Sequence, residues 1–457
     1  MVYVHEFDTL QETAQKILEE AKSQGVDSAQ IVVSSTENIA TRFGESHITQ
    51  NTQSNSLQFA LRSVIGEQIG SYYGTVPTDD NLSKMVSNAL ELVNFSPPDP
   101  EFPGFITEQP EYPDLDREII EYTPSDIADA IKIGIDAALS TGSKIDAVAG
   151  SINYNATRDL LANSYGVEAT SENSTISGIL NIAAVEGESE SRSSDSIAGR
   201  KIEDLAFETV APQIADRATR GLNQGELEVG KYESILGHSA MMELMFHLGL
   251  ATSSEMLINH QSPFKDKLGE KLFDERLTIT DATGDVSHYA SQKFDYDGVP
   301  SPTLTFIENG ILKEFAYNRR NAQKLGVETN GRAAGMFAIF RSPTITPGNK
   351  SEEELIASID DGVYVSNLWY SNFVNMPDAS ITGLTRDGLF KIEGGEIVGS
   401  VKNMRFTDTL YSMFEEAEPA NNQLMKLHGT YGNMLGLAGK LPSIRIGNFN
   451  FSSKGKH

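Results

Sequence analysis

The chain of 457 residues is predicted to adopt an α+β fold with antiparallel sheets. Alternating apolar and polar residues, which are typical of strands, follow one another in blocks, and helical patterns form separate blocks. The segment 303–318 also holds two alternating runs separated by Asn309-Gly310, the residue pair that a tight antiparallel hairpin turn requires. A parallel α/β sheet would instead alternate strands with helices along the whole chain.

The N-terminal part begins with a predicted helix. Thr9 and Glu12 have capping-box spacing at its start, and Gly25 ends it. A Pro-rich connection near 95–113 is too dense in proline for regular structure. Between these two features the sequence predicts strands at 29–34, 38–43, 56–64 and 67–74, and then a helix over about 81–93.

A third helix is predicted to start at Pro124, directly after the cap residue Thr123, and to end at Gly142. A fourth helix is expected over about 202–222. Residues 144–192 alternate in polarity and indicate an antiparallel meander. Its turns are expected at Asn163, Gly166, Asn173 and Gly187.

The segment 221–226 is expected to separate two domains, an N-terminal α+β domain over 1–222 and a C-terminal domain over 226–457. The second domain is predicted to be mainly antiparallel β with a few helices. Its expected elements are a strand at 231–237, a helix that carries residues 242–247, the hairpin at 303–318 and a helix capped by Ser351 with Glu354.

The composition restricts the classes of function. A net charge of −28 disfavours binding to nucleic acid, which requires Lys and Arg to displace phosphate counterions. No apolar run reaches a membrane-spanning length, and the N-terminus lacks the basic and apolar regions of a signal peptide. We therefore expect a cytoplasmic protein. The absence of cysteine excludes disulfides and thiolate metal ligands.

The helix at 242–247, with the sequence MELMFH, resembles a zinc-protease helix whose first ligand is replaced. Such a helix carries a His, an adjacent Glu that takes a proton from the zinc-bound water, and a second His about a turn further on. Glu243 and His247 are present, but Met242 occupies the first ligand position, and its thioether is a poor ligand for Zn²⁺. From these residues alone, a buried amphipathic helix is the simpler interpretation.

Two other kinds of candidate residue occur in the sequence. Ser239 lies in GHSAM, which follows a predicted strand and opens a helix as a nucleophile elbow does, but Met241 replaces the final glycine of that motif. The remaining candidates, His260, His288 and His428, have no partner His at metal-ligand spacing. A solvated or core position is the expectation for each.

Taken together, these segments resemble the TldD/PmbA family, also called peptidase family U62 or the modulator of DNA gyrase family. The resemblance covers nearly the whole chain. It is carried by the order and spacing of several segments, among them SLQFALRSVIGEQIGSYYG, DGVPSPTLTFIENGILKEF, TNGRAAG, SEEELIASIDDGVYVSNLW, GLTRDGLFKIEGGEIVGSVKNMRF and GLAGKLPSIRIG.

The resemblance implies two subunit types that share one fold. The TldD type binds zinc through an HExxxH helix and a distal Cys, and the PmbA or TldE type lacks the metal site and pairs with it. Here the helix ligand positions are Met242 and His247, and Ala438 stands at the position of the Cys. TNGRAAG also lacks the second Arg of the family's GNGRR. The chain is therefore similar to the PmbA/TldE type, with no cofactor expected of its own.

Three functions remain open from the sequence. The first is a non-catalytic subunit of a TldD/TldE-like metalloprotease that acts on short or unfolded peptides, with zinc held by a TldD-type partner. The second is a homodimeric peptide-binding or scaffold protein without protease activity. The third is an active hydrolase that uses Glu243 with His247, or Ser239. A role at DNA follows only from the family name and disagrees with the acidic charge.

Overall fold

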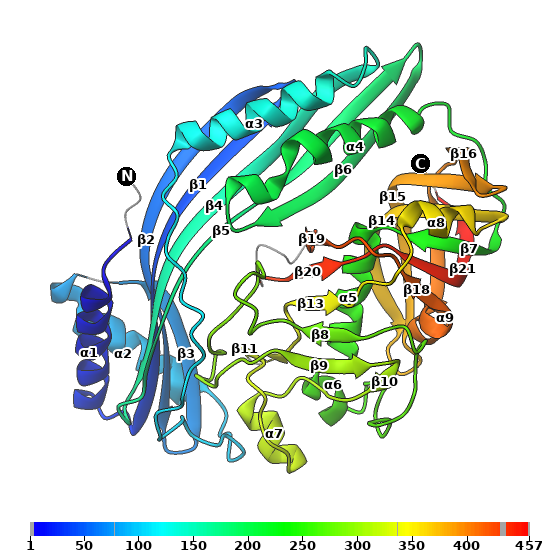
Figure 1. Ribbon diagram of the computed structural model, residues 1–457. Coiled ribbons are helices and arrows are strands. Elements are labelled where there is room, and N and C mark those ends of the chain that lie inside the picture. Colours follow the sequence, from blue (N-terminus) through cyan, green and yellow to red (C-terminus); the bar gives the residue numbers. More distant parts are fainter. Residues whose placement is uncertain (1–3, 77, 336, 430–435, 456–457) are drawn as a thin grey trace.

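The computed structural model describes residues 4–76, 78–335, 337–429 and 436–455. Helices and antiparallel sheets occur together in these ranges, which confirms the predicted α+β class. Figure 1 shows a long curved sheet from the first half of the chain beside a second half built on two further sheets.

The curved sheet has six antiparallel strands in the order β3-β2-β1-β4-β5-β6. The strands predicted at 29–34 and 38–43 form one strand, because Ser35, Thr36 and Glu37 between them contain no glycine or proline and stay paired on both sides. Asn173 lies inside a strand opposite Thr157, so the turn predicted there was wrong. The strands are β1 (Ser28–Gly44), β2 (His47–Ile65), β3 (Gln68–Thr75), β4 (Ile145–Asn163), β5 (Glu168–Glu186) and β6 (Ser189–Gly199).

The two faces of this sheet differ in chemistry because successive side chains of a strand point to opposite sides. Cross-strand neighbours such as Ile39 with Tyr154 and Val33 with Leu160 place apolar side chains on one face. The residues next to them, such as Asn155 opposite Thr175, place amide and hydroxyl groups on the other. One face therefore packs against helices, and the other is polar.

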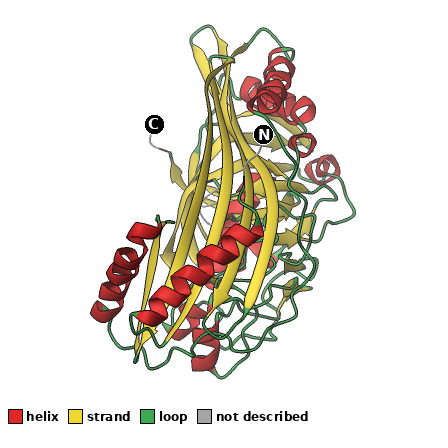
Figure 2. Cartoon of the chain, turned by 90° about the vertical axis from the view of Figure 1, so that its left-hand side faces the viewer, coloured by secondary structure: helices red, strands yellow, loops and turns green. Residues whose placement is uncertain are grey.

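Four helices cover the apolar face in two pairs, which lie at opposite ends of the sheet in Figure 1. Figure 2 shows the strands running side by side with helices packed across them. The helices are α1 (Phe7–Ser23), α2 (Asp79–Phe95), α3 (Pro124–Leu139) and α4 (Phe207–Arg220), with a 3-10 turn, η1, at Ile202–Leu205.

Helix boundaries agree with the cap signals in one of these helices and not in another. Thr123 and Asp126 form a reciprocal capping box at the start of α3, with Pro124 in the first turn. The box predicted from Thr9 and Glu12 was wrong, because α1 begins two residues before Thr9 and its N-cap, Glu6, makes no side-chain cap bond. Thr9 is inside the helix, where its carbonyl accepts a hydrogen bond from Thr13.

The second half contains a six-stranded sheet in the order β10-β9-β8-β13-β20-β19 and a seven-stranded sheet in the order β14-β7-β21-β17-β15-β16, with β18 paired to β21. Most pairings are antiparallel, but β14 pairs with β7 and β13 pairs with β20 in parallel. Two more strands, β11 (Ala333–Ala334) and β12 (Phe337–Ala338), form a small separate ladder. The strands of the two larger sheets are β7 (Gly230–Leu236), β8 (Ile279–Asp281), β9 (Leu304–Glu308), β10 (Ile311–Leu312), β13 (Pro343–Ile345), β14 (Asp361–Asn375), β15 (Ser380–Glu393), β16 (Glu396–Ser400), β17 (Met404–Thr409), β18 (Ala417–Pro419), β19 (Leu424–Leu427), β20 (Ala438–Leu441) and β21 (Ile444–Lys454).

Helix α5 (His238–Ala251) contacts strands of both larger sheets, β14 on one side and β19 and β20 on the other. Its buried residues therefore lie on more than one face, so the helix is buried as expected but is not amphipathic. Shorter helices complete this half: α6 (Ser254–Ile258), α7 (Arg319–Leu325), α8 (Glu352–Ala357) and α9 (Leu410–Glu415).

Two local predictions in this half are confirmed. Asn309 and Gly310 have φ angles of 50° and 76°, which are the positive values that a type I′ turn requires between β9 and β10. Ser351 and Glu354 form the reciprocal capping box of α8. Within the described ranges, no helix is long and apolar enough to cross a membrane.

Candidate functional site around helix α5

The carboxylate of Glu243 points from α5 toward the residue that follows strand β19. Its Oε2 lies 3.0 Å from Nε2 of His428, a side chain that is almost fully buried. Burial raises the pKa of Glu243, but the contact with His428 and further contacts with His247 and Ser371 outweigh burial and hold the pKa below its usual value. Glu243 is therefore a partly buried carboxylate with a histidine partner.

The imidazole of His247 is held by its own helix and by neighbouring aromatic rings. Its Nδ1 lies 2.8 Å from the backbone carbonyl of Glu243, one helical turn back. Its ring packs between Phe246 and Phe373, at centroid distances of 5.4 and 5.1 Å. Burial lowers the pKa of His247, which favours the neutral imidazole. These contacts describe a histidine whose hydrogen bond and packing are satisfied inside the core.

The structure brings the other two family ligand positions close together. Met242 is buried on α5, and its Sδ would lie 3.0 Å from a Cβ atom placed on Gly439. Ala438, the residue before that glycine, packs in a small apolar cluster with Ala198 of β6 and Leu427 of β19. The two positions at which the resemblance leads us to expect His and Cys in a zinc-binding chain thus carry a thioether and a methyl group.

Ser239 contacts a carboxylate that is a poor proton acceptor. Its hydroxyl donates a hydrogen bond of 2.7 Å to Asp195 of β6, which also accepts from Lys426 at 2.7 Å and from Arg217 at 2.8 Å. Burial raises the pKa of Asp195, but the two cations outweigh it and hold the pKa far below its usual value. A carboxylate held ionised in this way is a weak base, so the geometry does not support a Ser239 nucleophile.

The other histidines occupy unrelated positions. His288 is buried, burial lowers its pKa to about 4, and its Nδ1 accepts a hydrogen bond from the backbone N–H of Ala290. His260 is exposed near Lys265, with 3.0 Å between its Nδ1 and the ammonium nitrogen. Among the described residues, no group of three or more His, Cys, Asp or Glu side chains is arranged to hold a metal ion.

A groove of about 860 Å³ runs between the polar face of the curved sheet and loops of the second half. The sheet contributes amide and hydroxyl side chains from three adjacent strands, among them Asn38, Asn155, Thr157, Ser171 and Asn173. The opposite wall comes from the segment 289–296, from 333–335 and from Arg341. Amide and hydroxyl groups both donate and accept hydrogen bonds, so these walls can bind a peptide backbone.

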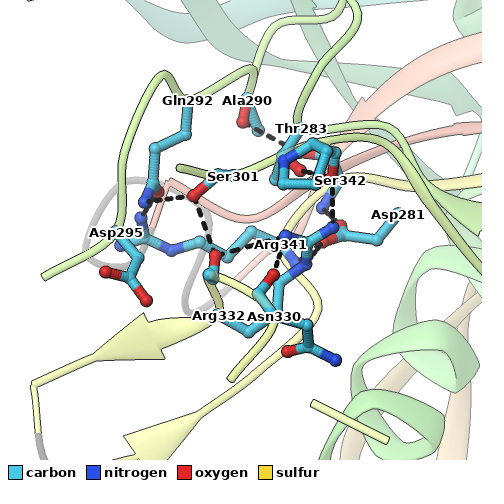
Figure 3. Close-up of polar contacts among 12 residues, drawn as sticks. Asp281, Thr283, Ala290, Gln292, Asp295, Ser301, Asn330, Arg332, Arg341 and Ser342 are labelled. Atoms are coloured by element: carbon cyan, nitrogen blue, oxygen red, sulfur yellow. Dashed lines mark hydrogen bonds and ion pairs between the residues drawn. The ribbon is translucent and has the colours of Figure 1, made fainter. Parts of the chain in front are cut away.

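A buried polar network supports this opposite wall (Figure 3). Arg332 and Asp281 form an almost completely buried ion pair, with 2.5 Å between Nε and Oδ2. Asp281 Oδ1 accepts hydrogen bonds from the backbone N–H groups of Arg341 and Ser342, and the Arg341 guanidinium donates to Gln292. Arg332, from the TNGRAAG segment, therefore has a structural partner beside the groove.

Asp295 completes the wall from inside the loop. Its carboxylate accepts hydrogen bonds from the backbone N–H groups of Asp297, Val299 and Ala333. Burial, followed by the nearby charge of Asp297, raises its pKa to about 7. This buried carboxylate ties the loop at 295–299 to strand β11.

Sequence reasoning missed three residues of this region: His428 as the partner of Glu243, and Asp195 with Lys426 beneath Ser239. His428 lies 185 positions after Glu243, and no periodicity connects them. Lys426 lies between Met425 and Leu427, and a lysine between two apolar residues was the one signal in the sequence for this buried cluster.

Two domains of one protein family match this chain. Residues 117–222 match the PmbA/TldA metallopeptidase central domain, and residues 229–453 match the PmbA/TldA metallopeptidase C-terminal domain. The chain is 26% identical over 438 residues to metalloprotease PmbA of Escherichia coli O157:H7, which covers 90% of this chain and 93% of that protein. It is 31% identical over 163 residues to metalloprotease MJ0996 of Methanocaldococcus jannaschii, which covers 34% of this chain and 36% of that protein.

The fold is also that of a solved structure. TldE from Thermococcus kodakarensis superposes with a TM-score of 0.84 at 20% identity, over 96% of this chain and all of that one. The two matched domains and the shared fold thus define a member of a metallopeptidase family. The chain belongs to the PmbA/TldD family.

The zinc ion of the family's metal-binding type does not fit the residues of this chain. Of the three ligand positions, Met242 and Ala438 offer no nitrogen, oxygen or thiolate donor, and His247 is held by its own helix. Glu243 contacts His428 in place of a metal-bound water.

Proposed function

We propose that this chain is the non-catalytic, PmbA/TldE-type subunit of a TldD/TldE-like metalloprotease. The observation that carries the proposal is that a thioether, from Met242, and a methyl group, from Ala438, stand at two of the three family ligand positions. Zinc and the reacting water belong to a TldD-type partner in this proposal. Relatives with both kinds of name, PmbA homologues and TldD homologues, support the existence of two subunit types.

The contribution of this chain is to hold an extended or unfolded peptide for the partner. Support comes from the groove of about 860 Å³, whose sheet wall is mostly Asn, Ser and Thr side chains. Such a wall can bind the peptide backbone, which is the same in every sequence, and needs no pocket for a particular side chain. The substrate class that this favours is short or unfolded peptides.

The first test is the zinc content of the purified chain after mild chelation and re-addition of zinc. We expect less than about a tenth of an equivalent, because two ligands are replaced. About one equivalent would overturn the metal-free assignment. A Glu243→Ala variant tests the remaining hydrolase interpretation, because peptidase activity of the pure chain that this substitution removes would restore it.

The second test measures cleavage of an unfolded peptide by a TldD-type partner with and without this chain. We expect the pair to be more active than the partner alone. Ser171→Trp should reduce the gain because it places a large ring in the groove, whereas Ser23→Trp, an exposed position on α1 at the other face of the sheet, should not. Equal activity of the partner alone would refute the subunit role. A homodimer that does not exchange with the partner would favour the scaffold function instead.

A further inference from the structure

A small polar pocket of about 260 Å³ lies where the two halves of the chain meet. Strand β6 and the C-terminal turn of α4 line it from the first half, and β15 with the end of β16 line it from the second. Gln224, in the segment that connects the halves, closes it from a third direction. The pocket shares no lining residue with the groove described above.

Three arginines from three different elements line this pocket: Arg192 of β6, Arg217 of α4 and Arg386 of β15. Arg192 is exposed, and it takes part in no ion pair among the described residues. Arg217 donates through Nη2 to Asp195, but its Nε is buried and has no hydrogen-bond partner in the described part of the chain. A bound ligand can supply the acceptor that such an unsatisfied buried donor needs.

Arg386 is also incompletely neutralised. Its guanidinium carbon lies 4.2 Å from the centroid of the Trp369 ring, and its Nε lies 3.7 Å from Oδ2 of Asp387. That carboxylate already accepts hydrogen bonds from Ser194 at 2.6 Å and from Asn367 at 3.1 Å. Glu190, the other acid of the lining, is exposed. With Asp195, which pairs with Arg217, three guanidinium groups therefore face three carboxylates, two of which already accept other hydrogen bonds.

The backbone at this pocket is irregular. Asp387 has a φ angle of 60°, and the register of β14 against β15 shifts between Val365 and Asn367, directly opposite. A non-glycine residue in the left-handed region is strained, and such residues concentrate at ligand sites. A register shift in a strand changes the direction of the side chains beside it. Here the side chain involved is Arg386.

We propose that this pocket binds a small oxyanion, a phosphate or a carboxylate group, between Arg192, Arg217 and Arg386. Planar guanidinium groups match the oxygens of both anions through paired hydrogen bonds. The volume suits a group of a few heavy atoms and is below the range of larger organic ligands. Because the rest of the chain is strongly acidic, an anion would concentrate here only through these specific contacts.

A bound anion would join the two halves of the chain, because its contacts come from β6, α4 and β15. Binding to the folded protein alone raises the unfolding temperature in a saturable way. The test is therefore a titration of the full chain with inorganic phosphate, and separately with succinate, at constant ionic strength adjusted with sodium chloride. The readouts are the thermal midpoint and calorimetric binding.

We expect saturable binding of at least one of the two anions in the millimolar range or tighter. Arg192→Gln and Arg386→Gln should each weaken the affinity by about tenfold, because each removes one charged contact. Arg42→Gln removes the same charge from an exposed position on β1 outside the pocket and should leave the affinity unchanged.

The two anions distinguish the source of the group, since preference for phosphate points to a phosphorylated ligand and preference for succinate to a carboxylate. Absence of saturable binding for both would overturn the proposal. Equal loss in Arg42→Gln would do the same, because it would assign the effect to net charge. Since Arg192 makes no ion pair in the described chain, Arg192→Gln keeps the fold and the test remains interpretable if Arg386→Gln does not fold.

Discussion

Asp195 is a single residue that bonds to both halves of the chain. It lies on β6, the edge strand of the curved sheet, and it accepts hydrogen bonds from Arg217 of the first half and from Ser239 and Lys426 of the second. Lys426 is only 3% exposed, so its charge has no access to bulk water. Loss of the carboxylate would leave a buried ammonium group uncompensated.

Asp195→Asn is expected to lower the free energy of unfolding by about 3–5 kcal/mol, the usual cost of removing one partner from a buried ion pair. Chemical denaturation monitored by fluorescence measures this. Asp216→Asn is the matched control, because Asp216 pairs with Arg220 on the surface of α4 and both side chains are more than half exposed. It should cost less than about 1 kcal/mol. Equal effects would show that the Asp195 cluster does not hold the halves together.

The carboxylate of Glu243 predicts a specific dependence on pH. Its pKa is lower in the folded chain than the usual 4.5, so its contribution to stability is complete above that pH and is lost as the pH falls through the folded pKa. The difference in unfolding free energy between the native chain and Glu243→Gln should therefore be largest at neutral pH and shrink below pH 4.5. Denaturation curves at several pH values measure it, and a difference that grows in acid would contradict this assignment.

At the scale of elements, local signals succeeded where the signal lies within a few residues. The capping boxes at Thr123 and Ser351 and the turn at Asn309-Gly310 depend on neighbouring atoms, and each is present. The box at Thr9 failed because the helix starts earlier, at Phe7, which places Thr9 inside its first turn. The division of β1 into two strands failed because the polar residues at 34–38 continue the strand, with Ser34, Thr36 and Asn38 on the polar face and Ser35 and Glu37 buried on the other.

The hairpin turn between β9 and β10 allows a test at this scale. Gly310→Ala should lower the free energy of unfolding by about 3 kcal/mol, because its φ angle is 76° and the new Cβ would lie 2.2 Å from the carbonyl oxygen of Phe273. Gly326→Ala has a similar φ angle of 68° but no atom within 4 Å of the new Cβ, and it should cost about 1 kcal/mol. Thermal and chemical denaturation of both variants separate backbone strain from steric overlap. Equal losses would mean that the overlap with Phe273 relaxes freely.

At the scale of the whole molecule, the net charge of −28 acts against compactness. Like charges on the surface repel one another, and salt screens this repulsion within about 10 Å at 0.1 M ionic strength. We therefore expect the thermal midpoint to rise as sodium chloride increases from about 10 mM to about 300 mM. Scanning calorimetry measures the shift. A lower midpoint in salt would show that attractive surface ion pairs outweigh the net repulsion.

The groove is also a feature of the whole molecule, because its two walls come from different halves. Strand alternation in the sequence predicts the polar face of the curved sheet, but that face forms a groove only with the residues that lie opposite it. Residues 289–296 and Arg341 form the other wall of the groove only because the second half is placed against that face. The domain boundary at 221–226, with domains over 1–222 and 226–457, stays a prediction.

The sequence by itself determined the α+β class, the order of most helices and strands, and the family, and it predicted that Met242 and Ala438 replace two family ligands. These follow from patterns local in the chain or from the order of segments. Only the tertiary structure decided that Glu243 contacts His428, that Ser239 contacts Asp195, and that three arginines meet at one pocket. The physical reason is that these contacts join residues far apart in the chain, and burial and charge act through space on whichever groups the fold brings together.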